Sequence, residues 1–411
     1  MSESPSEHQT HHSHDVAGQT TEVVVLDGAR TPQGKLLGQL ASLQATDLGA
    51  HAIKHALQRA GVAAEDVDHV IMGHVVQAGC GQNPAKQSAV KAGVPVTVPA
   101  MTVNKVCLSG LVAVTDAARL IRAGEAQVVV AGGQESMTNA PHLLPGSRKG
   151  KAYGDVTMVD AVAHDGLVDA TENIAMGTLT ERGNADRALT RDAQDQVAAR
   201  SHQLAGKAAA DGVFAQEIAP LEIPQRKGEP VTVDSDQGIR PEATAESLAG
   251  LRPAFGAEGT ITAGNSSPLS DGATALVLAS RQWAEEHGLS WLAMVGAAGQ
   301  VAGPDNSLHS QPSAAIETAV NKAGWAVSEL DFVEINEAFA AVSLQSLKDL
   351  DYPLERTNIH GGAIALGHPI GASGARLALT AALELERRGS GRAAVSLCGG
   401  GGQGEALLLY R

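Results

Sequence analysis

An internal repeat constrains the fold of this chain more than any other feature of its sequence. Residues 52–70, AIKHALQRAGVAAEDVDHV, align without a gap with residues 315–333, AIETAVNKAGWAVSELDFV, and the identical pairs include Gly61 with Gly324. Each copy predicts a helix that ends at a glycine, followed by a turn and a strand. Because the copies lie too far apart for a solenoid, we expect one α/β domain that is duplicated within the chain.

The segments that follow each copy continue the parallel. Residues 110–133 and 371–400 each combine an apolar helical stretch, a glycine turn, a β-rich run and a glycine cluster. Alternation of strand and helix predicts a largely parallel sheet with helices on both faces, so the expected fold class is α/β. Two related halves would then pack together and bring strand ends and helix starts to one site.

The region between the halves breaks this pattern. Residues 138–255 are polar, contain several prolines and predict one clear helix, near residues 190–210. An insert on a rigid core is a natural place for substrate contacts. We therefore expect an N-terminal domain over residues 22–288, which carries this insert, and a C-terminal domain over residues 289–411.

Composition excludes several classes of function. The 411 residues exceed the size of one ordinary core and favour two or three domains. The formal net charge is -15 and no long basic run occurs, so we expect no nucleic-acid partner. No apolar run approaches the roughly 20 residues of a membrane span. The N-terminus lacks the apolar core of a signal peptide, so we expect no membrane contact and a cytoplasmic protein.

The cysteines and histidines argue against two further features, a disulfide framework and a metal site in the N-terminal tail. Three cysteines without a CxxC pair indicate free thiols rather than a disulfide framework. Residues 1–21 are polar and without periodicity, and we expect them to be disordered. The spacing of the histidines in this tail matches no closed metal site, so we predict no metal there; they are His8, His11, His12 and His14.

Cys107 occupies an unusual position for a cysteine. Residues 104–110, NKVCLSG, lie between a β-branched stretch and an apolar helical run that ends at Gly124. A thiol near a helix start experiences the positive end of the helix dipole, so we expect the pKa of Cys107 to be lowered. The alternative is a small buried apolar side chain. A nucleophilic role requires a base and an oxyanion site elsewhere in the chain.

The second half offers candidates for these groups. Asn336 and Glu337 follow the strand DFVEI at its carboxyl end, where open α/β sheets bind ligands. A helix cap is the alternative explanation for Asn336. His368, within NIHGGAIALGHPIGASGAR (358–376), lies near a helix start, at the place that corresponds to Cys107 in the first half. If the two helix starts meet, the histidine can activate the thiol; a structural histidine is the alternative.

A second thiol completes this set. Cys398 ends a β-rich run in SLCGGGGQG (396–404) and precedes four glycines, whose N–H groups could line a site. The glycines are not a phosphate loop, because the Walker lysine and a following helix are missing. Burial is the alternative explanation for Cys398. A thiol has an ordinary pKa near 8.5 that is readily shifted, so this one could act as a proton shuttle.

With these residues in view, the chain resembles the thiolases, the coenzyme A dependent acyltransferases that make or cleave 3-ketoacyl-CoA. The resemblance runs from about Glu22 to Arg411 and rests on motifs in the family's order: VVVLDGARTPQGK, QAGCGQNPAKQ, NKVCLSG, AGGQESMTNAP, GTITAGNSSPLSDGA, NEAFA, GHPIGASGAR and CGGGGQG. The family implies a duplicated αβαβα fold of five layers with a loop domain inserted in the first half.

The resemblance also implies a role for each catalytic residue. Cys107 would carry the acyl group and His368 would activate it. Cys398 would move the proton at the α-carbon of the second acyl-CoA. Asn336, through a water, and His368 would form one oxyanion hole, and the backbone N–H groups of Cys107 and Gly400 would form the other. The expected activity is that of an acetyl-CoA C-acetyltransferase, with coenzyme A as a substrate and no metal or redox cofactor.

The same resemblance implies where the substrate binds. Arg240 would lie by the adenine or its phosphate, with a solvated surface charge as the alternative. Other contacts would be Phe255 and Ser267 along the pantetheine, and Phe339 and Met176 around the acyl pocket. Biosynthetic acetoacetyl-CoA members often have His-Met-Gly where this chain has Ala175-Met176-Gly177, which opens room beside the thioester. Homotetramers or homodimers are usual in the family.

Three alternatives remain from the sequence. A 3-ketoacyl-CoA thiolase of broader chain length, as in fatty-acid β-oxidation, would use the same residues. Decarboxylating condensing enzymes of related fold would need a second catalytic histidine or an asparagine in place of Cys398. A non-catalytic, lipid-binding relative would be expected to have lost Cys107, His368 or Cys398, and all three are present.

Overall fold

The computed structural model describes residues 21–225 and 227–411. The histidine-containing tail predicted to be disordered lies, up to residue 20, outside the described residues. Within the described part of the chain, no helix is long and apolar enough to cross a membrane.

The sequence repeat corresponds to a structural repeat. In each half a helix ends at a glycine with positive φ, 66° at Gly61 and 68° at Gly324, and a short 3-10 turn and a strand follow. Glycine is favoured there because left-handed backbone costs it no Cβ contact. The repeated elements are α1 (Ala45–Ala60) and β3 (His69–Gly73) in the first half, and α8 (Gln311–Ala323) and β14 (Phe332–Ile335) in the second. Later in each half, α3 (Ser109–Arg122) precedes β5 (Val128–Ser136), and α11 (Ser373–Arg388) precedes β15 (Arg392–Gly399).

The strands form a mixed sheet, so the expected largely parallel sheet is wrong. Only β3 with β4, β3 with β5, and β14 with β15 are parallel; the other neighbouring pairs along the sheet are antiparallel. The reason is connectivity: β15 and β16 are joined by a tight turn, which permits only an antiparallel pair. The order is β14, β15, β16 (Gln403–Tyr410), β13 (Ala293–Ala302), β1 (Val23–Arg30), β12 (Ser270–Ser280), β5, β3 and β4 (Ala100–Val103), with β2 (Gly34–Lys35) beside β12.

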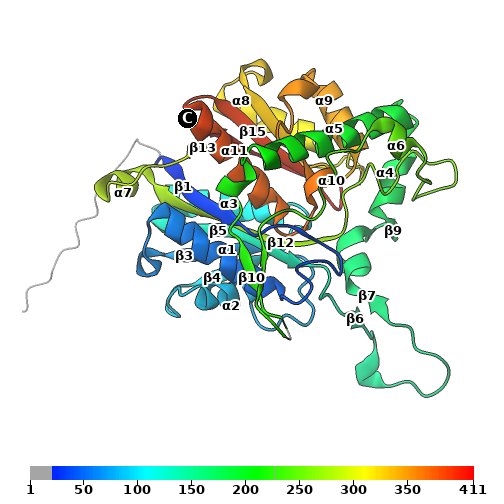
Figure 1. Ribbon diagram of the computed structural model, residues 1–411, viewed down its shortest axis with the longest axis horizontal. Helices are drawn as coiled ribbons and strands as arrows, with labels where there is room; N and C mark the ends of the chain where they lie inside the picture. Colours follow the sequence, from blue (N-terminus) through cyan, green and yellow to red (C-terminus); the bar gives the residue numbers. More distant parts are fainter. Residues whose placement is uncertain (1–20, 226) are drawn as a thin grey trace, which may run out of the picture.

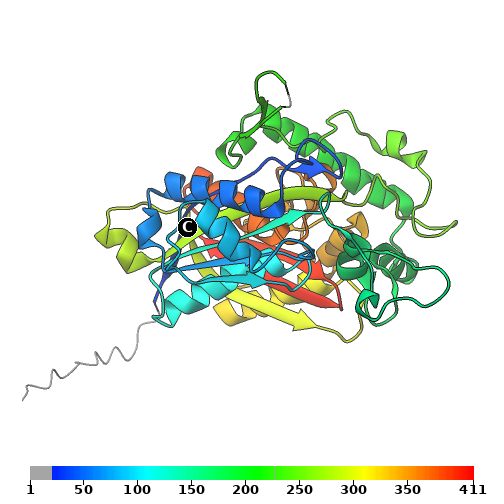
Figure 2. The same ribbon diagram turned by 90° about the horizontal axis from the view of Figure 1, so that it is seen from below.

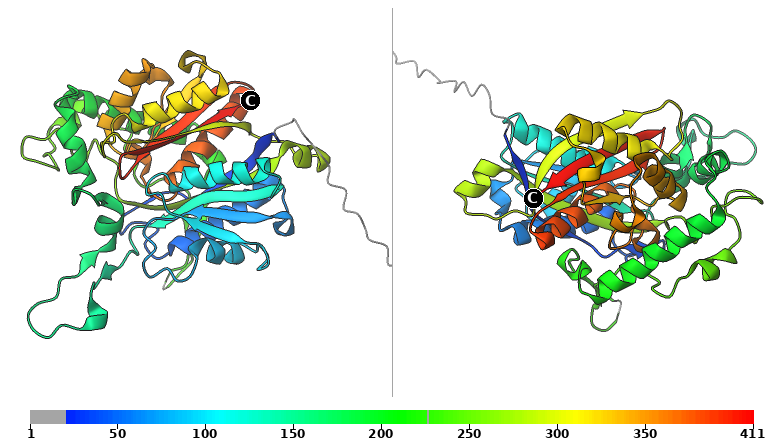
Figure 3. Two further views of the ribbon diagram at one scale, coloured as in Figure 1. Left: turned by 180° about the vertical axis from the view of Figure 1, so that it is seen from behind. Right: turned by 90° about the horizontal axis from the view of Figure 1, so that it is seen from above.

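The predicted five layers are confirmed. Helices α3 and α11 form the central layer, and one half of the sheet lies on each side of it (Figures 1 and 3). The outer face of the first half is covered by α1 and α2 (Pro84–Lys91). The outer face of the second half is covered by α8, with α9 (Ala340–Leu350) beside it. The two halves of the sheet meet through a short pairing of β1 with β13, at Val24 with Met294 and Val25 with Ala293. Helix α7 (Arg281–Glu286) connects β12 to β13.

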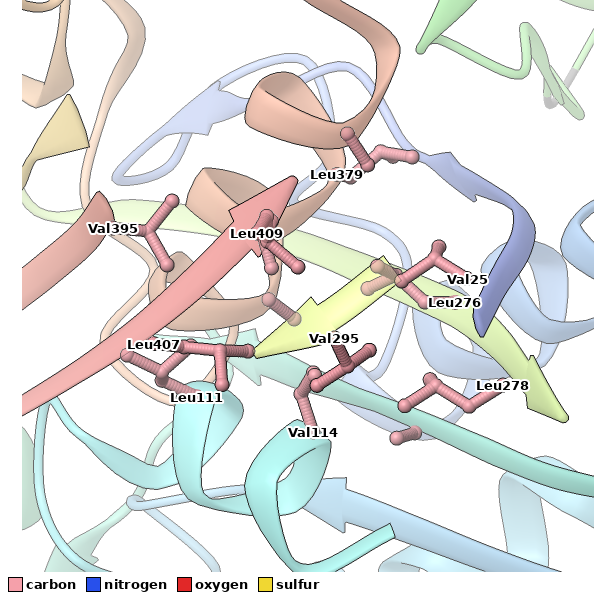
Figure 4. Packing of buried hydrophobic residues seen from close by; sticks show 14 of the residues in the cluster. Val25, Leu111, Val114, Leu276, Leu278, Val295, Leu379, Val395, Leu407 and Leu409 are labelled. Carbon is pink, nitrogen blue, oxygen red and sulfur yellow. The ribbon is translucent and has the colours of Figure 1, made fainter. Parts of the chain in front are cut away.

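The central layer is the main core of the molecule. Leu111 and Val114 of α3 pack with Leu379 of α11 and with leucines and valines from both halves of the sheet (Figure 4). The helix starts approach backbone to backbone: a Cβ built on Gly374 would lie 2.4 Å from the Leu111 nitrogen, and one on Gly110 would lie 2.9 Å from the Ala375 nitrogen. The expectation that the starts of α3 and α11 meet is therefore confirmed.

The predicted insert lies outside these layers and along one side of them (Figure 2). The helix expected near residues 190–210 is present as α5 (Arg191–Ala210), capped by the Thr190 hydroxyl. The structure adds further elements: α4 (Met176–Asn184), α6 (Ala245–Ala249), a π-helix at Val162–Leu167, and the short strand pairs β6 (His142–Leu143) with β7 (Val159–Asp160), β8 (Val168–Asp169) with β9 (Ile174–Ala175), and β10 (Leu221–Ile223) with β11 (Val231–Val233). The segment between β6 and β7 projects from the body (Figure 1).

Candidate active site

A cavity of about 320 Å³ opens where the two halves and the insert meet. Most of the predicted site residues line it: Cys107, Met176, Phe255, Ser267, Phe339, His368, Cys398 and Gly400. The remaining wall is almost entirely apolar. Residues from opposite ends of the sequence are therefore brought together as the repeat predicted.

Cys107 lies on a strained turn just before α3, residues 104–108, called the Cys107 turn below. Val106 has φ 51°, a left-handed conformation that is unfavourable for a β-branched residue. Side chains hold this turn: the Val106 N–H donates to Asn104 Oδ1 at 3.0 Å, and the Lys105 N–H donates to Ser109 Oγ at 2.8 Å. The turn directs the Cys107 side chain into the cavity, where it remains partly exposed.

The expected lowering of the Cys107 pKa is wrong. Burial, with a smaller contribution from the nearby Glu135 carboxylate, raises the pKa of the Cys107 thiol to about 12. Withdrawal of the thiolate from water thus outweighs the dipole of α3. The thiol is protonated at rest, so attack by its sulfur requires a base.

His368 lines the same cavity and is the candidate for that base. Burial, and secondarily the charge of Arg376, lowers the pKa of His368 to about 3, so the imidazole is neutral. Its Nδ1 lies 2.6 Å from Ser373 Oγ, which donates its own proton to the Pro369 carbonyl at 3.0 Å. Nδ1 must therefore carry the imidazole proton, which leaves Nε2 as an acceptor.

Asn336 contacts His368 from the end of β14. Asn336 Nδ2 lies 3.3 Å from His368 Nε2, and both side chains are buried. The helix-cap alternative for Asn336 is excluded, because α9 begins at Ala340 and its cap residue is Phe339. Glu337, the next residue, accepts hydrogen bonds from Ser201 and Asn358 and serves the packing of the insert.

Cys398 and Gly400 form the opposite wall. Cys398 is 1% exposed, and burial together with the proximity of Cys107 raises its pKa above the usual range of a thiol. The Cys107 turn packs directly on the Gly400 turn, the glycines at residues 399–402 that join β15 to β16. A Cβ built on Gly399 would lie 2.6 Å from Leu108 Cγ. The two thiols and the backbone of both turns thus face one space.

The predicted substrate contacts divide into two groups. Phe255 and Phe339 meet edge to face, with ring centroids 6.2 Å apart, and Ser267 Oγ donates to the Ala338 carbonyl at 3.2 Å. Phe255, Phe339, Ser267 and Met176, the first residue of α4, line the cavity. Arg240 does not line it. Its exposed guanidinium lies 3.0 Å from His202 Nε2 instead.

Several residues at the site, in its lining or behind it, were not predicted from the sequence. Ser373, which orients His368, lies within the GHPIGASGAR motif five residues after the histidine, so its position was a usable signal. The apolar wall gave no signal, because isolated apolar residues in a sequence cannot be distinguished from core. It includes Met137, Ala163, Leu167, Leu269 and Ile370, and Ala175 also lines it.

Comparison with known proteins places this site in a family. The model of the thiolase N-terminal domain matches residues 23–282, and the model of the thiolase C-terminal domain matches residues 289–411. The chain is 57% identical over 388 residues to a probable acetyl-CoA acetyltransferase of Mycolicibacterium smegmatis, covering 94% of this chain and 100% of the relative.

Two other relatives are similar over almost their whole length. An acetyl-CoA acetyltransferase of Cupriavidus necator is 48% identical, with 95% of this chain and 100% of the relative covered. The crystal structure of the Bacillus anthracis acetyl-CoA acetyltransferase superposes with a TM-score of 0.92 at 39% identity, covering 95% of this chain and 99% of that one. Both halves of the duplicated fold are thus matched, and the chain belongs to the thiolase family.

Proposed function

We propose that this enzyme is an acetyl-CoA C-acetyltransferase, which joins two acetyl-CoA molecules or cleaves 3-ketoacyl-CoA through an acyl group on Cys107. One observation carries the proposal: a neutral histidine, whose acceptor nitrogen contacts Asn336, shares a cavity with two protonated thiols. The names of the relatives support the same reaction.

In thiolysis, His368 Nε2 takes the proton of Cys107, and the sulfur attacks the 3-keto carbon. The negative charge that develops on the substrate oxygen needs fixed donors, which Asn336 with His368 and the N–H groups of Cys107 and Gly400 can provide. The bond between C2 and C3 breaks, and its electron pair stays on C2 as the enolate of acetyl-CoA. Cys398 protonates that carbon. The thiol of coenzyme A then attacks the acyl carbon and releases Cys107. The proton of that thiol and the proton held by His368 return to the Cys107 and Cys398 sulfurs, which restores the resting enzyme.

Condensation follows the reverse order. Acetyl-CoA first acetylates Cys107 and releases coenzyme A. Cys398 then removes an α-proton from a second acetyl-CoA, and the resulting carbanion attacks the acetyl carbon on Cys107. Two protonated thiols suit this scheme, because one must lose its proton to become a nucleophile and the other must exchange a proton with carbon.

Coenzyme A is a substrate in this proposal, and no other cofactor or metal is invoked. Phe255, Ser267, Phe339 and Met176 would contact its pantetheine arm and the acyl group. We further propose a cytoplasmic homotetramer or homodimer. Light scattering of the purified protein tests the oligomeric state, and fractionation of cells tests the compartment.

The proposal is tested by acyl transfer itself. The purified enzyme is mixed with acetyl-CoA alone, and digestion followed by mass spectrometry should find one acetyl group, on the peptide that carries Cys107. Thiolysis of acetoacetyl-CoA should depend on added coenzyme A. Absence of both reactions in folded protein would overturn the proposal.

A broader 3-ketoacyl-CoA thiolase is the second candidate. The observation that favours it is the small Ala175 at the cavity wall, next to an otherwise apolar lining. kcat/KM for thiolysis is compared across 3-ketoacyl-CoA esters of increasing length. A steep preference for acetoacetyl-CoA supports the short-chain enzyme, whereas equal or higher values for long esters support the broader one.

A further inference from the structure

An ion pair that the proposed mechanism does not use joins the Cys107 turn to the second half of the molecule. Lys105 Nζ lies 2.9 Å from Glu405 Oε2. The Glu405 side chain is 0% exposed and that of Lys105 is 25% exposed. A carboxylate is buried at a large cost unless a cation and hydrogen bonds compensate it. This pair therefore differs from the exposed ion pairs of the surface.

The surroundings of Glu405 fix its carboxylate in place. Glu405 lies on β16, paired with Leu397 of β15 on one side and with Gln300 of β13 on the other. Gln300 Nε2 lies 2.9 and 3.0 Å from the two carboxylate oxygens, and Thr115 Oγ1 of α3 lies 3.5 Å from one of them. No other basic side chain among residues 21–225 and 227–411 forms an ion pair with Glu405. Lys105 thus reaches a rigid, prearranged anchor.

The two segments joined by this pair carry the reacting groups. Lys105 precedes Cys107 by two residues, and β16 begins directly after the glycine turn that contains Gly400. The turns touch: a Cβ built on Gly400 would lie 3.5 Å from Val106 Cγ1. A small shift of one turn over the other would therefore move the Cys107 sulfur relative to the Gly400 N–H.

The Cys107 turn also needs an external constraint. Val106 has φ 51°, and conformations of this kind persist only where their surroundings enforce them. The hydrogen bonds within the turn are local and would move with it. The contact of Lys105 with Glu405 is the charged link from this turn to the opposite half.

We propose that Lys105 and Glu405 are positioning residues, which hold the Cys107 turn against the Gly400 turn so that nucleophile and oxyanion donors keep one geometry. This inference rests on the proposed function, because it concerns alignment for acyl transfer. A displacement of about 1 Å in such an alignment can reduce a rate by about 100-fold.

Variants that remove the link test this role. We expect Lys105→Met, and the double variant Lys105→Met/Glu405→Gln, to lower kcat for thiolysis of acetoacetyl-CoA by about tenfold or more, with KM changed less than about twofold. Lys105→Arg, which keeps the charge, should retain most of the activity. The double variant leaves no unpaired buried charge, so it decides the matter if the single variant fails to fold.

Alkylation of Cys107 separates positioning from loss of folded protein. Iodoacetamide forms a bond between sulfur and carbon with loss of iodide; this step needs the thiolate but no oxyanion hole. We expect alkylation of Cys107 in the double variant to stay within about twofold of wild type while kcat falls. Unfolded protein would instead expose this thiol and restore its ordinary pKa of about 8.5, so a smaller folded fraction would speed alkylation while it lowered kcat. Lys91→Met is the matched control, because it removes an exposed ion pair with Asp47 in the same half.

The outcomes are distinct. Thiolysis by the wild-type enzyme is measured first, and its absence would contradict the proposed function rather than this inference. If the wild type is active and the double variant keeps its kcat, the positioning role is wrong. A fall in alkylation that matches the fall in kcat would refute it as well.

Discussion

Burial keeps Cys107, Cys398 and His368 uncharged at rest. It raises the pKa of both thiols and lowers the pKa of His368 to about 3, so an ion pair between Cys107 and His368 does not form before the substrate binds. In the proposed mechanism, proton transfer from Cys107 to His368 would be completed only as the substrate oxygen becomes charged and is met by fixed donors. The mostly apolar lining of the cavity would also limit access of water to an acyl thioester.

The two cysteines should fail at different steps. Cys107→Ala removes the nucleophile, so we expect no acetyl-enzyme and a fall in kcat on the order of 10⁴-fold or more. Cys398→Ser should still accept an acetyl group from acetyl-CoA but should not form or cleave the bond between carbons. Mass spectrometry of the acetylated peptide and a thiolysis assay measure the two steps. Near-normal turnover of Cys107→Ala would contradict the mechanism.

Ser373 should act through His368. Ser373→Ala removes the oxygen that accepts from Nδ1–H, so the imidazole can rotate or change tautomer, and we expect kcat to fall by about tenfold. Iodoacetamide alkylation of Cys107 should slow with it, because the same base is needed. Ser343→Ala is the control, since that buried hydroxyl of α9 has no hydrogen-bond partner among the described residues. Unchanged kinetics in Ser373→Ala would show that packing alone holds the imidazole.

At the scale of elements, the sequence was most informative where local rules dominate. Helices α1 and α8 end at glycines, as expected from the backbone preference of that residue. Helix α5 begins after Thr190, as expected from its capping hydroxyl. Strand direction was not predictable in this way. It depends on how connections cross the sheet, and the turn between β15 and β16 imposes an antiparallel pair that the alternation of elements does not reveal.

The same distinction applies to the site. Cys107, His368 and Cys398 stand out in sequence because glycines and polar residues surround them, and all three line the cavity. The sign of the Cys107 pKa shift was missed, because desolvation depends on residues far away in the sequence. The position of Arg240 outside the cavity depends on how the insert folds over α5, where His202 holds it.

The contact between the starts of α3 and α11 should not tolerate a methyl group. Gly374→Ala places a Cβ 2.4 Å from the Leu111 nitrogen, so the helices must separate. We expect the free energy of unfolding to fall by about 1–3 kcal/mol, measured by urea denaturation. The control is Gly250→Ala, where the added Cβ meets nothing within 4 Å and φ is -74°; its effect should stay within about 0.5 kcal/mol. Equal stability of the two variants would contradict the close packing.

At the scale of the whole molecule, buried histidines set the response to acid. Burial lowers the pKa of several of them to about 4: His51, His74, His202 and His309. Between pH 4 and 6.5 the unfolded chain binds protons that the folded chain does not, so these groups make stability fall as the pH falls. Carboxyls withdrawn from water act in the opposite direction, because burial raises the pKa of Glu135 to about 7 and that of Glu334 to about 8, and it also raises the pKa of Asp27, Asp271 and Glu337. Histidines and carboxyls thus oppose each other, and the histidines supply the part of the response in which acid destabilises the fold.

His309 allows this linkage to be measured one group at a time. Its side chain is buried, with Nε2 2.9 Å from Asn184 Oδ1, and glutamine in its place keeps a donor for that contact. We expect the free energy of unfolding of His309→Gln to depend less on pH than that of the wild type, by about 1.4 kcal/mol per pH unit between pH 6.5 and 4. Urea denaturation at several pH values measures the difference. Identical pH curves for His309→Gln and the wild type would mean that His309 is protonated in the folded state.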